Sequence, residues 1–166
     1  MSKSRSTKET PIFIPRKIVS GGQTGVDRGG LDAAIALGIQ HGGWCPKGRL
    51  AEDGSVPSRY ELVETDTSDY PERTQRNIED SDATLILYET KLKGGTLLTR
   101  KLCKRIDKPH LCLRLGRDAP GLAQQWLASA KPNILNIAGP RESNSDGISE
   151  RTLAFLLAVF AVERTD

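Results

Sequence analysis

The residues best suited to chemistry in this chain lie in one short stretch, Gly21 to Arg28, where two glycines precede several polar and charged side chains. The apolar run before it, Lys17 to Ser20, is typical of a buried strand, and the apolar residues after it, such as Leu31 and Ile35, recur at helical spacing. A strand, a glycine turn and the start of a helix together point free backbone N–H groups at an anion. This stretch therefore predicts an anion-binding turn.

The polar side chains of this turn have expected roles. Thr24 is expected to cap the helix, and Arg28, one turn inside it, could reach back to a ligand with two N–H groups. The turn matches neither the Walker A loop nor the full dinucleotide fingerprint, and a tight turn without a ligand is the alternative. A valine at position 22 is expected to cost binding more than folding. The site residues expected here are Gly21, Gly22, Gln23, Thr24, Gly25, Asp27 and Arg28.

Strands and helices alternate along the rest of the chain. The apolar run at 83–88 is typical of a central parallel strand, and Pro and Gly separate most of the elements. The alternation predicts right-handed βαβ units in a Rossmann-like, doubly wound α/β fold, with a mostly parallel sheet and helices on both faces. The expected strands are 17–20, 39–44, 60–65, 83–88, 109–113 and 134–138; the expected helices are 24–38, 69–80, 97–106, 119–130 and 149–162; and 45–59 is expected to be a polar loop.

Two further glycine turns follow expected strands, at Gly94 and at Gly139. Ligands of parallel sheets bind at the carboxyl ends of the strands, so we expect the three turns to gather at one edge. Taken singly, these segments could also be ordinary loops and solvated helix surface, and Trp44 could be a packing residue rather than a platform for a flat ring. The further site residues expected are Arg73, Asn77, Gly94, Gly95, Thr96, Gly139, Arg141, Glu142 and Ser143, with Trp44 and Lys47 at the pocket rim.

Length and composition narrow the function classes. The 166 residues suit one domain, which we expect over 16–166 behind a disordered tail over 1–15. The net charge of +3 suits a small anionic ligand, and aromatic residues at 5% are too few for a platform that stacks nucleic-acid bases. No signal peptide or membrane-spanning run is evident, so we expect a cytoplasmic protein that binds neither nucleic acid nor a membrane.

Catalytic groups are not evident in the sequence. We find no paired nucleophile and base, no nucleophile elbow and no cluster with metal-ligand spacing, and we therefore expect no catalytic and no metal-binding residues. Four carboxylates in loops or at helix starts could act as an acid or a base, and the sequence assigns that role to none of them. They are Asp27, Glu52, Asp53 and Glu142. Of the three cysteines, Cys45 is expected in a loop and is the one candidate for reactivity.

Taken together, the motifs resemble the molybdenum carrier family, a branch of the lysine-decarboxylase-like Rossmann proteins. The resemblance rests on segments 20–34, 42–54, 70–86, 94–96 and 138–143 and covers about Ile18 to Phe160. It implies a homo-oligomer, a dimer or a tetramer, that binds, protects and transfers molybdenum cofactor (molybdopterin) or molybdate without chemistry of its own. Molybdoenzymes or cofactor-synthesis proteins would then be its donors and acceptors.

A related branch that cleaves nucleoside monophosphates is the alternative. That branch carries Gly-Gly-x-Gly-Thr-x-x-Glu, whereas Thr99 stands here at the position of its catalytic glutamate, and the second glycine spacing is missing. The alternative functions are therefore a nucleotide phosphoribohydrolase-like enzyme and a nucleotide-sensing module.

Overall fold

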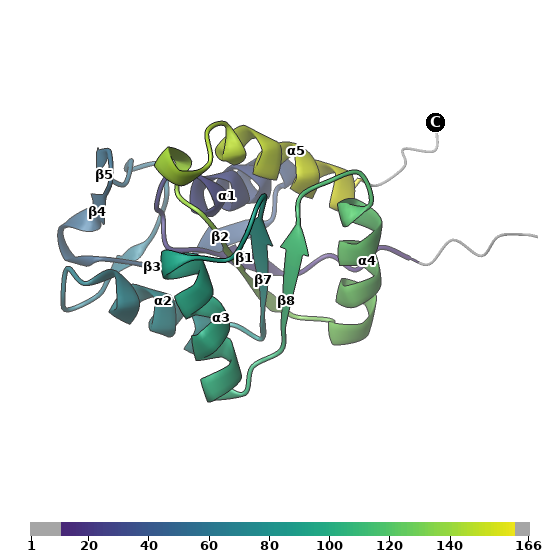
Figure 1. Ribbon diagram of the computed structural model, residues 1–166, viewed down its shortest axis with the longest axis horizontal. Helices are drawn as coiled ribbons and strands as arrows, with labels where there is room; N and C mark the ends of the chain where they lie inside the picture. Colours follow the sequence, from purple (N-terminus) through teal and green to yellow (C-terminus); the bar gives the residue numbers. More distant parts are fainter. Residues whose placement is uncertain (1–10, 162–166) are drawn as a thin grey trace, which may run out of the picture.

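The computed structural model describes residues 11–161, which fold around a five-stranded sheet (Figure 1). The strand order is β2-β1-β9-β7-β8, and every pair is parallel. This order places β1, β9 and β7 in the middle of the sheet. The strands are β1 (Lys17–Val19), β2 (Gln40–Gly42), β7 (Ala83–Tyr88), β8 (His110–Arg114) and β9 (Ile134–Ala138).

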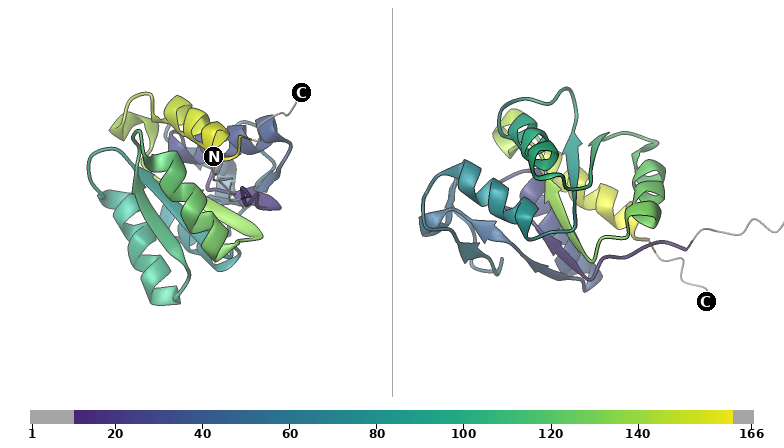
Figure 2. Two further views of the ribbon diagram at one scale, coloured as in Figure 1. Left: turned by 90° about the vertical axis from the view of Figure 1, so that its right-hand side faces the viewer. Right: turned by 90° about the horizontal axis from the view of Figure 1, so that it is seen from below.

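Helices cover both faces of this sheet, as the sequence predicts. Figures 1 and 2 show α1 and α5 on one side and α2 and α3 on the other. Strands and helices alternate as in Rossmann-like proteins, so the predicted fold class is confirmed. The helices are α1 (Val26–Leu37), α2 (Tyr70–Glu79), α3 (Gly94–Ile106), α4 (Ala119–Ala130) and α5 (Ile148–Val159), with short 3₁₀ turns η1 (Lys47–Arg49) and η2 (Glu142–Asn144).

The main core lies between the sheet and the layer of α1, α4 and α5. Leu85 and Leu87 of β7 and Leu135 of β9 are fully buried there, and each contributes roughly 1.5–3 kcal/mol by leaving water. A second cluster on the other face joins Ile78 of α2 to Leu102 and Cys103 of α3. The apolar strands β7 and β9 are thus covered on both faces, so a ligand can reach them at their ends.

The predicted strand 39–44 is broken at Gly43, which is a correction. Gly43 has φ 127°, a conformation that glycine adopts readily, and a Cβ there would lie 2.3 Å from the Ser20 carbonyl oxygen. The chain therefore leaves the main sheet after β2. The segment beyond forms β3 (Trp44–Cys45), paired with β6 (Val63–Glu64), and the hairpin of β4 (Leu50–Ala51) and β5 (Gly54–Ser55).

Two other expectations concern the chain's start and Cys45. The expected tail 1–15 lies partly outside the described residues, but Ile12 and Phe13 are described and pack against the main core. Cys45 lies in strand β3 rather than in a loop, and burial raises the pKa of its thiol, which removes the reason to call it reactive.

None of the helices within 11–161 combines the length and apolar character that crossing a membrane requires.

Candidate functional site

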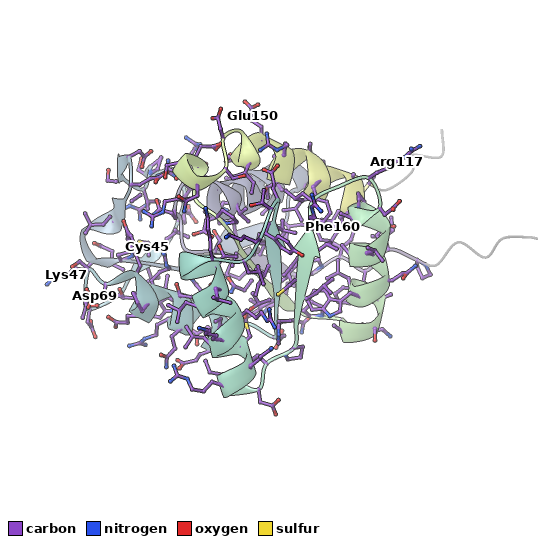
Figure 3. All side chains as sticks on the ribbon, viewed as in Figure 1. Cys45, Lys47, Asp69, Arg117, Glu150 and Phe160 are labelled. Atoms are coloured by element: carbon purple, nitrogen blue, oxygen red, sulfur yellow. The ribbon has the colours of Figure 1, made fainter. Side chains whose placement is uncertain are left out.

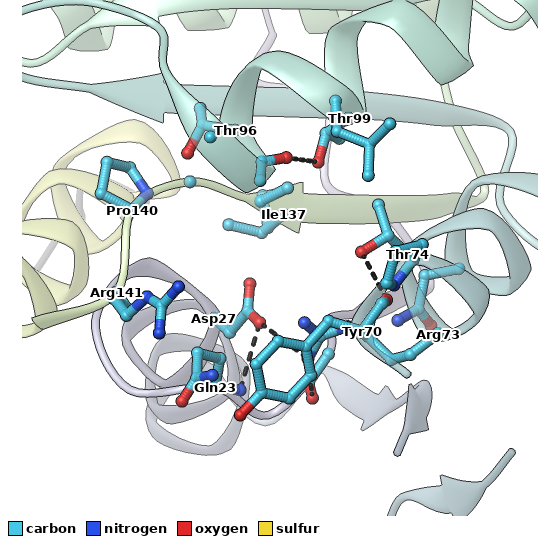
Figure 4. Close-up of a pocket in the computed structure, with 18 of the residues that line it drawn as sticks. Gln23, Asp27, Tyr70, Arg73, Thr74, Thr96, Thr99, Ile137, Pro140 and Arg141 are labelled. Carbon is cyan, nitrogen blue, oxygen red and sulfur yellow. Dashed lines mark hydrogen bonds and ion pairs between the residues drawn. The ribbon is translucent and has the colours of Figure 1, made fainter. Parts of the chain in front are cut away.

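The carboxyl ends of β1, β7 and β9 open into one cleft with a volume of about 320 Å³ (Figure 4). Turns from all three strand ends line it, so the predicted convergence of Gly21, Gly94 and Gly139 is confirmed. The volume is within the range of small-molecule sites, roughly 300–1,000 Å³. The expected site residues that line it are Gly21, Gln23, Asp27, Arg73, Asn77, Gly94, Gly95, Thr96, Gly139 and Arg141.

The start of α3 is the part of the cleft best suited to an anion. Thr96 and Leu97 donate their N–H groups to the Lys93 carbonyl oxygen, whereas the N–H groups of Gly94 and Gly95 form no hydrogen bond within the described part of the chain. The positive end of the helix dipole adds to these two donors. Lys93, just before the helix, lines the same wall. An anion at this wall would meet two free amides and an ammonium group.

The turn between β1 and α1 differs from the expectation that its amides are free for a ligand. The Gln23 N–H donates to Asp27 Oδ2 at 3.1 Å, the Thr24 N–H donates to Gln23 Oε1 at 3.1 Å, and the Val26 N–H donates to the Pro140 carbonyl oxygen at 3.1 Å. Buried N–H groups require partners, and the fold supplies them from within the chain. The carboxylates next to this turn belong to the protein itself: Asp27 accepts the Gln23 N–H, and Glu52 accepts the Thr24 hydroxyl.

Asp27 forms a buried pair with Arg73 of α2. Asp27 Oδ2 and Arg73 Nη1 are 3.8 Å apart, and Arg73 Nη1 also donates to the Gly21 carbonyl oxygen at 2.9 Å. Burial raises the pKa of Asp27 to about 6, because the lowering effects of Arg73 and of the Gln23 N–H do not fully offset the lost hydration. Asp27 therefore carries a carboxyl group that changes charge close to neutral pH.

Arg28 faces away from the cleft. Its guanidinium holds Asp53 with two hydrogen bonds of 2.5 and 2.7 Å, and its Nε donates to the Gly22 carbonyl oxygen at 3.1 Å. The expected reach back to a ligand is therefore replaced by an anchor for the β4–β5 hairpin. Sequence spacing could not show this, because Asp53 lies in another segment.

Thr24 does not cap α1, which corrects a further expectation. The N-cap is Gly25, with no side-chain cap, and the Thr24 hydroxyl bonds to the Glu52 carboxylate instead. That hydroxyl also accepts the Glu142 N–H at 3.1 Å. The side chain of Glu142 in turn accepts the Ser149 N–H, at 3.4 Å, at the start of α5.

Glu52 joins the hairpin to two of the three turns. Besides Thr24, it accepts the Ser143 N–H at 3.1 Å and the Ser143 hydroxyl at 2.5 Å, and its Oε2 lies 3.9 Å from Arg141 Nε. Burial by itself would raise the pKa of Glu52, but the hydrogen bonds from Ser143 and Thr24 outweigh it and lower the pKa. Glu52 thus positions the turn that carries Arg141.

Asn77 and Trp44 form a structural pair. The Trp44 N–H donates to Asn77 Oδ1 at 2.8 Å, and Asn77 Nδ2 donates to the Trp44 carbonyl oxygen at 3.0 Å, which fastens β3 to α2. The Trp44 ring lies under Arg76 and donates to Asp80 at 2.7 Å. Lys47 is exposed at the outer edge of the molecule (Figure 3). Neither Trp44 nor Lys47 lines the cleft.

Gly22 contacts the hairpin segment rather than the cleft. It has φ +75°, and a Cβ there would lie 2.6 Å from the Leu62 side chain. The expectation that Gly22→Val would cost binding more than folding is therefore corrected, because the valine would strain the backbone and meet Leu62 rather than a ligand. The expected site residues that do not line the cleft are Gly22, Thr24, Gly25, Arg28, Glu142 and Ser143.

Several lining residues were not predicted. Asn136, in the otherwise apolar β9, donates to Thr84 at 3.2 Å, and this single polar residue in an apolar strand was the one available signal. Thr99 also lines the cleft and donates to the Gly95 carbonyl oxygen of its own helix at 2.9 Å. Within residues 11–161, no cluster of three or more His, Cys, Asp or Glu could hold a metal ion. The other unpredicted lining residues include Tyr70, Thr74, Lys93, Leu98 and Asn144.

Comparison with known proteins identifies close relatives of this fold. The family model described as "Circularly permutated YpsA SLOG family" matches residues 18–160. A crystal structure from Syntrophus aciditrophicus SB, named "Putative molybdenum carrier protein", is 47% identical, with a TM-score of 0.86; the match covers 92% of this chain and 98% of that one. None of the curated proteins matches this sequence.

Proposed function

The chain belongs to the circularly permutated YpsA SLOG family, and from this premise we propose that it is a carrier that binds molybdenum cofactor in the cleft between β1, β7 and β9. The 47% identical relative named a molybdenum carrier supports this role. The cargo is a pterin with a phosphate and an oxo-molybdenum centre. Transfer to and from molybdoenzymes or cofactor-synthesis proteins, and assembly as a homo-oligomer, belong to the same proposal.

One observation carries the proposal: the two free amides of Gly94 and Gly95 lie on a cleft wall that also holds Lys93, with Arg141 on the same cleft. Together they can hold an oxyanion, and each charge-assisted bond contributes roughly 1.5–3 kcal/mol. Apolar surface from Ile137 and Leu98 also lines the cleft and suits a flat ring. The cofactor carries its own dithiolene, so a lining without cysteine or histidine fits such a cargo.

A catalytic function is the second candidate, and Asp27 favours it. Of the four carboxylates considered from sequence, Asp27 is the one that lines the cleft, and its pKa of about 6 suits a general base. A nucleotide phosphoribohydrolase would need such a group near the ribose. Thr99, which bonds to its own helix, offers no acid or base there.

The experiment is a binding assay with cofactor released from a molybdoenzyme under anaerobic conditions. We expect saturable retention on the protein, slower oxidation of the bound cofactor and reactivation of an apo-molybdoenzyme by the loaded carrier. Molybdate and adenosine monophosphate are tested alongside to separate an oxyanion site from a nucleotide-sensing module. Absence of saturable retention would refute the carrier. Release of free base from nucleoside monophosphates, lost in Asp27→Asn, would establish the enzyme instead.

A further inference from the structure

The two ends of the cleft offer a ligand opposite chemistry. At the α3 end, the free amides of Gly94 and Gly95 and the ammonium group of Lys93 are donors. At the other end, Asp27 presents a carboxylate, and the N–H groups of Gln23 and Thr24 in the adjacent turn already have partners. An oxyanion is stabilised at the first end, whereas at the second the ionised Asp27 carboxylate repels it and offsets the attraction of the neighbouring Arg73 guanidinium. A ligand that fills both ends must therefore be anionic at one and a hydrogen-bond donor at the other.

The Asp27 carboxylate has acceptor capacity to spare. Its Oδ2 accepts the Gln23 N–H and lies 3.8 Å from Arg73, and the nearby Gly21 N–H also lowers the pKa of the carboxyl group, whereas no hydrogen bond joins Oδ1 to a group within residues 11–161. Figure 4 shows this second oxygen pointing into the cleft towards Ile137, while the dashed lines run to the other oxygen. Asp27 is 8% exposed, so the lone pairs of Oδ1 are directed into a confined site rather than into bulk water. The Asp27 side chain is 11% exposed, so this oxygen can accept a hydrogen bond from water or from a donor on a ligand in the cleft.

The surface between the two ends is suited to a ring. Ile137 lies between Asp27 and Thr96 in Figure 4, and Pro140 and Tyr70 also line the cleft. Apolar atoms above and below a planar heterocycle leave its edge to be read by polar groups. The ring edge that matches a carboxylate carries two neighbouring N–H donors, because Oδ1 and the remaining lone pair of Oδ2 can each accept one.

We propose that Asp27 is the specificity residue of this cleft, accepting hydrogen bonds from the 2-amino group and the adjacent ring N–H of a 2-amino-4-oxopyrimidine while the anionic substituent of that ring lies at the start of α3. The inference rests on the proposed function in taking this cleft as the ligand site. Pterins and guanine nucleotides share that ring, and both carry an anionic substituent. Bare molybdate lacks it and gains nothing from Asp27.

The test compares ligand pairs that differ in the 2-amino group. Pterin-6-carboxylate is paired with lumazine-6-carboxylate, whose 2-oxo group turns an acceptor towards the carboxylate, and guanosine monophosphate is paired with inosine monophosphate. With the wild-type chain we expect the preferred amino-bearing ligand to bind about 10-fold to 100-fold more tightly than its partner. Equal affinities within both pairs would overturn the proposal.

Asp27→Asn removes the charge and places an N–H donor in the cleft. We expect it to abolish the preference for the amino-bearing ligand and to leave molybdate affinity the same or higher. The matched control is Asp53→Asn, because Asp53 bonds to Arg28 outside the cleft, and it should keep the preference. A preference that survives in Asp27→Asn would overturn the proposal.

Wild-type protein provides a second measurement if Asp27→Asn folds poorly. The charged groups around Asp27 are Arg73 from α2, Arg28 from its own helix and Arg141 after β9, all of them guanidinium groups. Affinity for the amino-bearing ligand should fall about tenfold per pH unit below about pH 6, whereas its partner should show no such fall. If the affinities of both ligands changed with pH in the same way, the assignment of Asp27 as the specificity residue would be contradicted.

These binding measurements also distinguish a failure of this inference from a failure of the carrier proposal. Selective, Asp27-dependent binding of guanosine monophosphate, without retention of molybdenum cofactor, would leave the inference standing and remove the carrier. Retention of cofactor with no dependence on the 2-amino group or on Asp27 would do the reverse.

Discussion

Asp27 Oδ2 lies 3.8 Å from Arg73 Nη1 at the edge of the cleft, and Arg73 donates at the same time to the Gly21 carbonyl oxygen. One guanidinium therefore fixes both the glycine turn and the acidic side chain that faces the ligand. Both side chains are about nine-tenths buried, so the pair is screened little by salt. This relationship holds a carboxylate and a guanidinium rigidly in place opposite the start of α3.

Stability should depend on pH through Asp27. Its pKa is raised from 3.8 to about 6, so the folded chain binds more protons than the unfolded chain between these values. This contribution to stability is present below about pH 4, is lost as the pH rises to about 6 and stays lost above it. Asp27→Asn should therefore be up to about 3 kcal/mol more stable than wild type near neutral pH and equal to it below about pH 4. Urea denaturation across this range measures the difference, and a constant gap would contradict the raised pKa.

Filling the space at Gly95 should block binding without harming the fold. A Cβ at Gly95 meets nothing within 4 Å, its φ is not positive, and the residue lines the cleft at the start of α3. Gly95→Leu should weaken binding of the cleft ligand by at least about tenfold. Leucine is also the better helix former, so the free energy of unfolding should stay equal or rise by about 0.5–1 kcal/mol.

Gly121→Leu is the matched control for that substitution. Gly121 also lies in the first turn of a helix, α4, has open space at its Cβ and does not line the cleft. It should change stability in the same direction and leave affinity unchanged, as measured by calorimetry and thermal unfolding. Equal loss of affinity in both variants would show that the ligand does not contact the start of α3.

Removing Glu52 should loosen the turn after β9. Glu52→Ala deletes hydrogen bonds to Thr24 and Ser143, which should lower the free energy of unfolding by about 1–2 kcal/mol. Anion affinity should fall severalfold because Arg141 loses its anchor. Since the pKa of Glu52 is lowered, its contribution is present above the unfolded pKa and lost as the pH falls.

The control for Glu52 is Glu61→Ala. Glu61 is exposed on the same segment, and its side chain forms no hydrogen bond within residues 11–161, so stability and affinity should both stay unchanged. Isothermal calorimetry with molybdate and denaturation in urea measure the two effects. If Glu52→Ala behaves like Glu61→Ala, the proposed anchoring of Arg141 is wrong.

Substitution of Arg28 should lower stability, whereas substitution of Arg141 should lower ligand affinity. Arg28→Ala removes the bidentate anchor to Asp53 and should lower stability by about 1–2 kcal/mol while ligand affinity stays within about threefold of wild type. The Arg141 side chain is 43% exposed and lines the cleft. Arg141→Ala should therefore lower ligand affinity and leave stability nearly unchanged. A large loss of affinity in Arg28→Ala would place the ligand beyond the cleft described.

The sequence by itself determined most of the elements of the main sheet, its covering helices and the meeting point of the turns. Apolar runs and punctuating Gly and Pro fixed β7, α4 and β9 to the residue, because burial on both faces or on one helical face is a local pattern. The alternation of strands and helices determined a parallel sheet, and a parallel sheet places strand ends at one edge whatever the strand order. Gly21, Gly94 and Gly139 could therefore be assigned to one cleft.

Only the tertiary structure decided which partner each polar side chain takes. Arg28 pairs with Asp53, Thr24 with Glu52 and Asn77 with the Trp44 backbone, each across 25 or more positions, and none of these partners is marked by local spacing. From the sequence alone, a loop is predicted where the structure has the hairpin that supplies Glu52 and Asp53. Hydrogen bonds form between groups that the fold brings within about 3 Å, so a charge in sequence shows that a partner is needed but not which one.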